Sequence, residues 1–452
     1  MIKNENTKPT KELILEAAFS FLEKPGFSSF SMNELAAKVG ISKPAIYRHF
    51  KNKEAVLEEM ENRFVENMAG FLRNITCHDE IASQKSLAEL VDYFGANLSH
   101  INYFIAQMSS IPNYEEHLFD RLYECDVPFL ASESRKAYLE NFRNDMQKFS
   151  RHVFCGMTIF FFVSLQERFL KLGKISKPSK NFGDNVVNLM LEGLVGTTCK
   201  NDAFYPEPVS EERKKELFAL CKIPDETFPE ENRIFTALAS VIGKYKVPGV
   251  TVEKIADELN MAKSSLYEYF DNKNEMIKCL INKELQLLQT IIIENSVEAQ
   301  NFTEYVYILM ASEMEYFSHR PSIIPICGWL LMGDNGISEK KMEDCEEEGE
   351  AAPWEKRLPE RVTAPDLGFP YTRDVITGWI KCLPVAFLVE TKGKNISGEK
   401  CMEGFMLMID YILNELEETD EKSYWSSFYW ISVFRHLICA GIKICRKRCK
   451  EN

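Results

Sequence analysis

The sequence predicts an all-α protein built from two copies of one plan, and three observations support this. The chain has 452 residues, 45% of them hydrophobic and 27% charged, as in globular proteins with a packed core. Apolar residues recur at helical spacing in segments such as "NVVNLMLEGLV" and "CMEGFMLMIDYIL". A shift of 220 positions aligns residues 14–60 with 234–280 without a gap. That period is the size of a pair of domains, so a solenoid of small units is excluded.

The first copy begins with helices whose ends are marked by local signals. "TKELILEAAFSFLEKPG" has a helical apolar stripe that ends at the Pro25-Gly26 pair. Ser31 is an N-cap residue for "MNELAAKVG", and Glu34 completes a capping box. Gly40 follows, where a residue that tolerates positive φ closes the helix. These signals predict a short helix between a capped start and a tight turn.

A second short helix follows the turn. Ser42 is its predicted cap, Pro44 lies in its first turn, and Asn52 caps a longer helix from Lys53. In the second copy Thr251 is the cap and Asn260 occupies the turn, because Asn tolerates the left-handed conformation. Two short helices joined by a tight turn, with the second exposed, are typical of a helix-turn-helix.

These residues resemble the amino-terminal DNA-binding domain of TetR-type bacterial transcription regulators. The first copy fills that pattern at many positions in one frame: Ser31, Leu35, Ala36, Gly40, Ile41, Ser42, Ile46, Tyr47, His49, Phe50 and Lys53. The second copy matches through Thr251, Ile255, Ala256, Leu266, Tyr267, Tyr269, Phe270 and Lys273, and departs at Asn260, Met261 and Ala262. The resemblance covers about 50 residues of each half.

The resemblance implies how the rest of the chain is organised. Such regulators are homodimers whose protomers carry a helical effector and dimerisation domain, so two protomers fused in one chain are expected. The expected domains are a first helix-turn-helix domain (8–68), a first effector domain (69–205), a linker with one short helix (206–229), a second helix-turn-helix domain (230–288) and a second effector domain (289–452). Residues 333–370 are expected to be an acidic loop, and the last 30 residues an extra helix or two.

In this fused pseudo-dimer, helices near 144–200 should pack against helices near 371–418 in a four-helix interface. The chain would then be monomeric, with a homodimer of the full chain as the alternative. The resemblance also implies an effector, a small hydrophobic or cationic molecule. The aromatic and methionine residues around 153–165 suit a pocket, but a helical core has the same composition.

Double-stranded DNA is the expected partner of both motifs. Basic side chains on the short helix suit phosphates and guanine edges, and small apolar ones suit a thymine methyl group. Ile46, Phe50, Leu35, Ala36 and Val39 have core spacing. The candidate DNA-contacting residues are Ser31, Ser42, Lys43, Pro44, Ala45, Tyr47, Arg48, His49 and Lys53, with Thr251, Lys263, Ser264, Ser265, Tyr267, Tyr269 and Lys273 in the second motif.

The two motifs differ in charge. Residues 42–53 carry four basic side chains and no acid, whereas residues 262–273 carry two of each sign. Because neutralised phosphates dominate affinity, the second motif should bind DNA more weakly. The alternative is that it is a scaffold and the protein a co-regulator that contacts DNA through the first motif alone.

Other classes of protein are disfavoured. The net charge of −14 argues against indiscriminate nucleic-acid binding but allows a local basic patch. The 13 cysteines are widely scattered without a CxxC pair, so neither disulfides nor a metal is expected, and no catalytic constellation or cofactor motif is visible. The apolar run at 153–165 is too short for a membrane span. A cytoplasmic, ligand-responsive repressor that is not an enzyme is the expectation, with an operator that is not a perfect palindrome.

Overall fold

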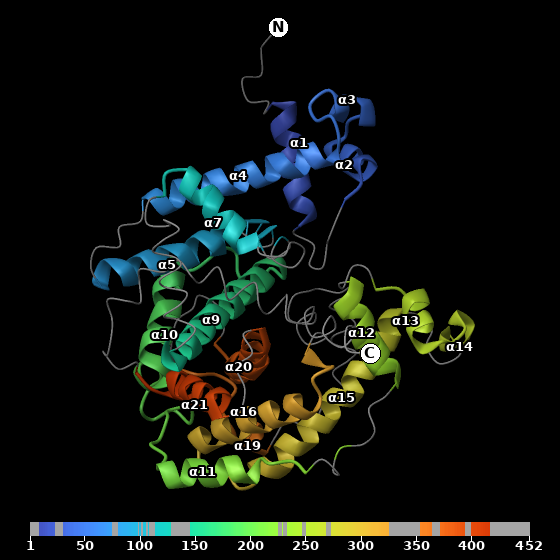
Figure 1. Cartoon of the computed structure of the whole chain (residues 1–452). Helices are drawn as coiled ribbons and strands as arrows, with labels where there is room; N and C mark the ends of the chain where they lie inside the picture. Colours follow the sequence, from blue (N-terminus) through green and yellow to red (C-terminus); the bar gives the residue numbers. More distant parts are fainter. Residues whose placement is uncertain are drawn as a thin grey trace.

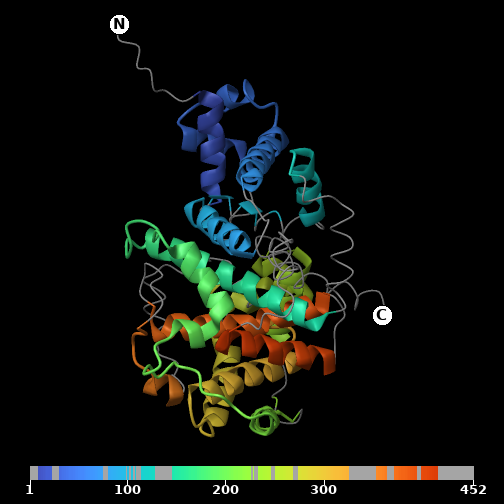
Figure 2. The same cartoon turned by 90° about the vertical axis from the view of Figure 1, so that its left-hand side faces the viewer.

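The computed structural model describes residues 9–22, 30–74, 80–97, 99–100, 103–104, 107, 114–127, 145–224, 228, 233–245, 250–267, 273–324, 353–363, 371–393 and 399–415. Within these ranges every regular element is a helix, and a single antiparallel bridge joins Arg361 to Thr372. The predicted all-α class is therefore confirmed (Figures 1 and 2).

The first half begins with a four-helix module and continues into longer helices. The module consists of α1 (Thr10–Phe21), α2 (Met32–Val39), α3 (Lys43–Tyr47) and α4 (Lys53–Arg73), at the top of Figure 1. After it come α5 (Glu80–Ala96), α7 (Tyr114–Glu124), α9 (Met146–Lys171) and α10 (Phe182–Thr197). α5 packs on α9 and α10, and α7 packs on α4.

The second half repeats this order. After α11 (Glu211–Leu220), the second module consists of α12 (Arg233–Tyr245), α13 (Val252–Leu259), α14 (Lys263–Tyr267) and α15 (Lys273–Ser296). It is followed by α16 (Phe302–His319), α19 (Pro353–Arg357), α20 (Arg373–Gly393) and α21 (Glu399–Leu413). The two modules lie apart, one at the top of Figure 1 and the other at its right.

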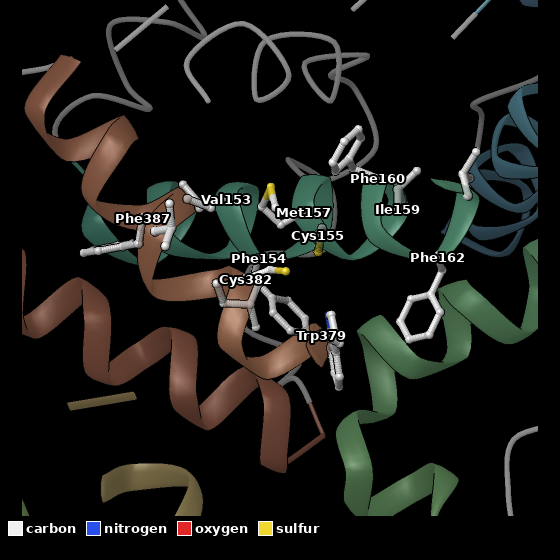
Figure 3. Packing of buried hydrophobic residues seen from close by; sticks show 14 of the residues in the cluster. Val153, Phe154, Cys155, Met157, Ile159, Phe160, Phe162, Trp379, Cys382 and Phe387 are labelled. Atoms are coloured by element: carbon white, nitrogen blue, oxygen red, sulfur yellow. The ribbon is translucent and has the colours of Figure 1, made fainter. Parts of the chain in front are cut away.

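The two halves meet where the sequence predicts. α9 packs on α20 and α21, and α10 also packs on α21, which confirms the predicted four-helix contact. Trp379 is fully buried there, and its indole donates a hydrogen bond to the Thr158 hydroxyl at 3.0 Å. Figure 3 shows Trp379 of α20 beside Phe154 of α9, their ring centroids 6.0 Å apart. Aromatic burial of this kind contributes strongly to interface stability.

A glycine allows the two halves to approach closely. Gly193 of α10 has φ 58°, a conformation that side chains with a Cβ rarely adopt. A Cβ atom at this position would lie 2.5 Å from the carbonyl oxygen of Asn414, at the end of α21. The sequence of α10 therefore permits a backbone contact between the halves that no larger residue would allow.

Helix α9 is longer than its apolar run. It has 26 residues with a mean hydropathy of 1.4 over an 18-residue window, enough to cross a membrane by length and composition. However, 61% of that window is buried inside the protein, because α9 packs against α5, α10, α20 and α21. Among the described residues it is the one helix that passes this test. Packing against protein accounts for its composition.

The segment between the halves contains the expected short helix, α11, and this helix is docked. Arg213 of α11 donates to both carboxylate oxygens of Glu304 on α16, at 3.1 and 2.9 Å. Lys214 lies 3.3 Å from the carboxylate of Asp410 on α21. Leu217 is 1% exposed. α11 is thus held on the second half by both charge and apolar packing.

Part of the expected acidic loop is folded, contrary to the prediction for 333–370. Residues 353–357 form α19, and the Trp354 indole donates to the carbonyl of Ala299 at 2.9 Å. Leu358 is 3% exposed. α19 packs on α15, and the burial of its apolar and aromatic residues outweighs the acidic and proline-rich composition of the surroundings. The other residues of the expected loop, 333–352 and 364–370, and the last 30 residues, where an extra helix or two was expected, lie outside the described residues.

Candidate nucleic-acid interface

The helix-turn-helix of the first module is fixed by local hydrogen bonds. The Ser31 hydroxyl accepts from the Glu34 amide at 3.1 Å, and the Glu34 carboxylate accepts from the Ser31 amide at 2.7 Å. The turn closes at Gly40, with φ 75°, where the Ile41 amide donates to the Ala36 carbonyl. The predicted capping box and turn are confirmed. Because its hydroxyl accepts this cap hydrogen bond, Ser31 fixes the start of α2.

Helix α3 is anchored by two apolar residues. Ile46 is fully buried and Phe50 is 4% exposed, and both pack on a core that includes Leu35 and Ala36. Val39 is partly buried against the same core. The predicted packing residues are confirmed. Their burial fixes which face of α3 is turned to solvent.

The opposite face of α3 carries the candidate contacts. Its exposed residues are Ser42, Lys43, Pro44, Tyr47, Arg48 and His49, while Ala45 is half-buried. Ser42 occupies the predicted cap position, but its side chain makes no hydrogen bond to the helix, so the predicted cap bond is wrong. Lys53 is half-buried and lies over the Phe30 ring, 5.4 Å from its centroid. Nearly all the candidates thus share one accessible surface.

Three basic side chains of this surface have no acidic partner in the part of the chain that the structure describes. Lys43, Arg48 and Lys51 make no ion pair with any carboxylate among the residues that the structure describes. Lys43 lies over the Tyr47 ring, 6.0 Å from its centroid. Acids of this module are engaged elsewhere: Glu12 accepts two hydrogen bonds from Arg63, which ties α1 to α4. The surface is therefore free to attract phosphate.

The second module has the same scaffold. The Thr251 hydroxyl accepts from the Lys254 amide at 3.3 Å, and Asn260 closes the turn at φ 52°. The Met261 amide donates to the Ala256 carbonyl, in the register of the Ile41 to Ala36 bond. Leu266 is 1% exposed, matching Ile46. The predicted cap and turn are confirmed, and the Asn substitution preserves the geometry.

Charge is arranged differently on the second module. Lys263, the first residue of α14, forms an ion pair with Glu253, the second residue of α13. Lys244 of α12 lies 2.5 Å from the carboxylate of Glu258, which also accepts from the Ser240 hydroxyl. The hydrogen bond from Lys263 lowers the pKa of Glu253 to about 2. Both carboxylates are therefore ionised at neutral pH.

The remaining candidates of the second motif are only partly described. Ser264 is exposed and Ser265 is half-buried. The backbone of Tyr267 and Lys273 lies in α14 and α15, and Tyr269 lies outside the described residues. The ion pair of Glu253 with Lys263 was not predicted, because Glu253 lies before residues 262–273, whose charges were compared. The signal was present in the sequence, because Glu253 aligns with the uncharged Asn33 at the same position after the cap.

Polar groups are also buried in the two helical regions, away from the modules. In the first, the Gln166 amide is fully buried and neither its oxygen nor its nitrogen has a partner among the described residues. In the second helical region, Oε2 of buried Glu313 also has no hydrogen-bond partner among the described residues, although the charged groups of Lys381 and Glu355 are near it. Burial raises the pKa of Glu313 well above its usual value.

Comparison with known sequences identifies the modules. Residues 14–60 and 234–280 each match the family model described as bacterial regulatory proteins, tetR family. The chain thus carries two helix-turn-helix domains of the type that this family model describes. Their bounds coincide with the internal repeat, and their helix-turn-helices are α2–α3 and α13–α14.

Curated relatives resemble a limited part of the chain. The uncharacterized HTH-type transcriptional regulator YvkB of Bacillus subtilis is 34% identical over 65 residues, which are 14% of this chain and 34% of YvkB. YvaF of the same organism is 36% identical over 62 residues, 14% of this chain and 32% of YvaF. Tetracycline repressor protein class D of Escherichia coli is 36% identical over 50 residues, 11% and 23% of the two chains. The chain thus spans about a third or less of these relatives.

Proposed function

We propose that the chain is a sequence-specific DNA-binding transcription regulator in which one polypeptide carries both DNA-reading modules. The observation that supports this most is the exposed, unpaired basic surface of α3, held by buried Ile46 and Phe50. A rigid short helix with basic side chains on its outer face is the element that enters a major groove. Lys43, Arg48 and Lys53 are the proposed phosphate and base contacts, with Tyr47 and His49 beside them.

The contact between the halves supports a pseudo-dimer. In this proposal α9, α10, α20 and α21 take the place of the interface between two protomers, and α11 fastens the connecting segment to the second half. One chain would then present two readers to half-sites about one helical turn or more apart. Because α3 and α14 carry different side chains, the proposed operator is an imperfect palindrome.

The two readers are proposed to be unequal. From cap to final lysine, residues 31–53 carry five basic side chains and one acid, whereas residues 251–273 carry three basic side chains and five acids. Each phosphate that a protein neutralises releases counterions and adds to affinity. The first module would therefore supply most of the binding free energy, and the second would add mainly selectivity.

A bound ligand would act on DNA binding through the contact between α4 of the first module and α7 of the helical region that follows it. Helix α4 belongs to the first module and is tied to α7 by contacts that include Glu61 with His117 at 2.5 Å and Asn62 with Arg121 at 2.8 Å. A small hydrophobic or cationic effector bound among the helices would shift α7 and thereby α4. The distance between the two readers would change and DNA would be released, which is repression relieved by a ligand.

A second candidate function is favoured by one observation. Lys263 is already paired with Glu253, so the second module has little free positive charge on α14. In that reading the second module is a scaffold, and the protein is a co-regulator that contacts DNA through the first module alone.

One experiment separates the two functions. Duplexes selected by the full chain from a random pool are used in mobility-shift titrations with Arg48→Ala and Lys263→Ala variants. Loss of binding from Arg48→Ala, with weaker binding to one half of the site from Lys263→Ala, supports the two-reader regulator. If Lys263→Ala changes nothing at any sequence, the scaffold function holds. If Arg48→Ala also binds like the parent chain, the regulator proposal is wrong.

A further inference from the structure

The proposed difference in DNA affinity between the two modules can be traced to one residue, which lies outside α3 and α14. Glu253 lies on α13, ten residues before Lys263, and pairs with it across the turn. In the first module the corresponding residues are Asn33 and Lys43. Asn33 has no charge, and Lys43 makes no ion pair among the described residues.

The two modules are similar enough for this single difference to be isolated. The first helix of each helix-turn-helix, α2 or α13, has eight residues and begins after a capping Ser or Thr. Both turns close with a residue at positive φ. Asn33 and Glu253 are therefore at the same place, the second residue of that helix, and Lys43 and Lys263 both begin the next helix. The two lysines therefore occupy equivalent backbone positions, and they differ in the charge of the second residue of the preceding helix.

The effect of Glu253 arises from where its charge lies. Glu253 and Lys263 are both about half exposed, with side-chain exposures of 54% and 45%, and such pairs add little to stability. The Lys263 ammonium can leave the carboxylate for a phosphate, but the carboxylate then stays at the DNA-facing edge and repels that phosphate. Either way the module loses about one unit of favourable charge at the interface.

We propose that Glu253 is a specificity-determining residue of the second module, which withholds Lys263 from the DNA backbone and makes that reader dependent on base contacts. This inference rests on the proposed DNA-binding function. Glu253 lowers the DNA affinity of the second module, and one substitution at this position should restore that affinity.

The test uses the full chain and the duplex it selects. Glu253→Gln should tighten binding by about 3- to 10-fold at 150 mM salt and steepen the log–log salt slope by about one, the value of one additional phosphate contact. Glu258→Gln is the matched control: it makes the same charge change on the same helix, but its partner is Lys244 on α12. It should change affinity less than about 2-fold.

A double-mutant cycle identifies the mechanism. Lys263→Ala alone should weaken binding to the second module's half-site measurably but only by about 2-fold, whereas in the Glu253→Gln background it should also remove the whole gain. The reciprocal change, Asn33→Glu in the first module, should weaken binding by about the same factor that Glu253→Gln gains. Far-ultraviolet circular dichroism on every variant confirms that the helices are retained.

Two outcomes would overturn the inference. Equal effects of Glu253→Gln and Glu258→Gln would show that overall charge is responsible, and a gain that survives Lys263→Ala would show that this lysine is not involved. Failure of the proposed function looks different: no duplex would be selected, or Arg48→Ala would bind like the parent chain.

Discussion

The two helix-turn-helix modules share a scaffold and differ on the surface that it presents. Caps at Ser31 and Thr251, turns at Gly40 and Asn260, and buried anchors at Ile46 and Leu266 correspond one to one. From cap to final lysine, the charged side chains change from five basic and one acidic to three basic and five acidic. The difference teaches that packing residues keep a domain folded while its charge is free to vary, so a module can keep its fold and lose affinity.

The largest expected effect tests whether the scaffold is shared. Ile46→Ala and Leu266→Ala should each destabilise their module by about 2–5 kcal/mol, because both remove fully buried side chains of similar size. Urea unfolding, followed by hydrogen exchange of α3 and α14, measures each module. A large effect in one module beside a negligible effect in the other would contradict a common scaffold.

The next effect compares the helical regions, which bury different unpaired groups. The folded pKa of Glu313 is raised above its unfolded value, so the folded state keeps a proton that the unfolded state loses above about pH 4.3. Stability contributed by Glu313 is therefore present at lower pH and is lost as pH rises. Glu313→Gln should stabilise the protein by about 1–3 kcal/mol at pH 7 and much less at pH 4.5.

Gln166→Met serves as the matched change in the first region. It removes a buried amide without a hydrogen-bond partner, so it should stabilise by a similar amount at both pH values. Thermal unfolding at the two pH values distinguishes the variants. A pH-independent gain from Glu313→Gln would mean that this carboxyl is ionised in the folded protein.

A smaller effect concerns the caps. Ser31→Ala and Thr251→Ala should each cost about 1 kcal/mol of stability, because each hydroxyl accepts an otherwise unpaired amide of its helix. Thermal unfolding gives the two values. If Ser31→Ala is much costlier, the reciprocal bond from the Ser31 amide to Glu34 adds stability that the second cap lacks.

The smallest effect concerns the turns. Asn260→Gly should stabilise the second module by a few tenths of a kcal/mol, and Gly40→Ala should destabilise the first by about 1 kcal/mol, since both positions have positive φ. Melting temperatures of the two variants should move in opposite directions. Movement in the same direction would contradict the equivalence of the turns.

Features encoded by neighbouring residues were predictable from the sequence. The capping box at Ser31, the turn at Gly40 and the burial of Ile46 depend on spacings of a few residues, and all were expected. The packing of α9 and α10 on α20 and α21 was also expected, because the resemblance to a family of homodimers, together with the repeat offset, implied two protomers. Local patterns and one internal repeat were sufficient for the fold of the modules and for the place of the candidate site.

Distant contacts other than this interface between the halves were not predictable. The docking of Arg213 on Glu304 and the burial of Trp354 against Ala299 join residues far apart in sequence, so the composition around them was misleading. The pair of Glu253 and Lys263 was not predicted for a different reason. The charges compared were those of residues 42–53 and 262–273, whereas the turn brings Glu253 of α13 beside Lys263 of α14.

The central claim is that one chain reads one DNA site through two unequal modules. Hydroxyl-radical footprinting of the full chain on its selected duplex across increasing salt, with the chain-to-duplex ratio measured by light scattering, tests it most directly. We predict one chain per duplex and two protected half-sites. The half-site whose protection is lost in the Arg48→Ala variant should stay protected to higher salt than the other one in the parent chain. Two chains per duplex, or half-sites that are lost together at the same salt concentration, would contradict it.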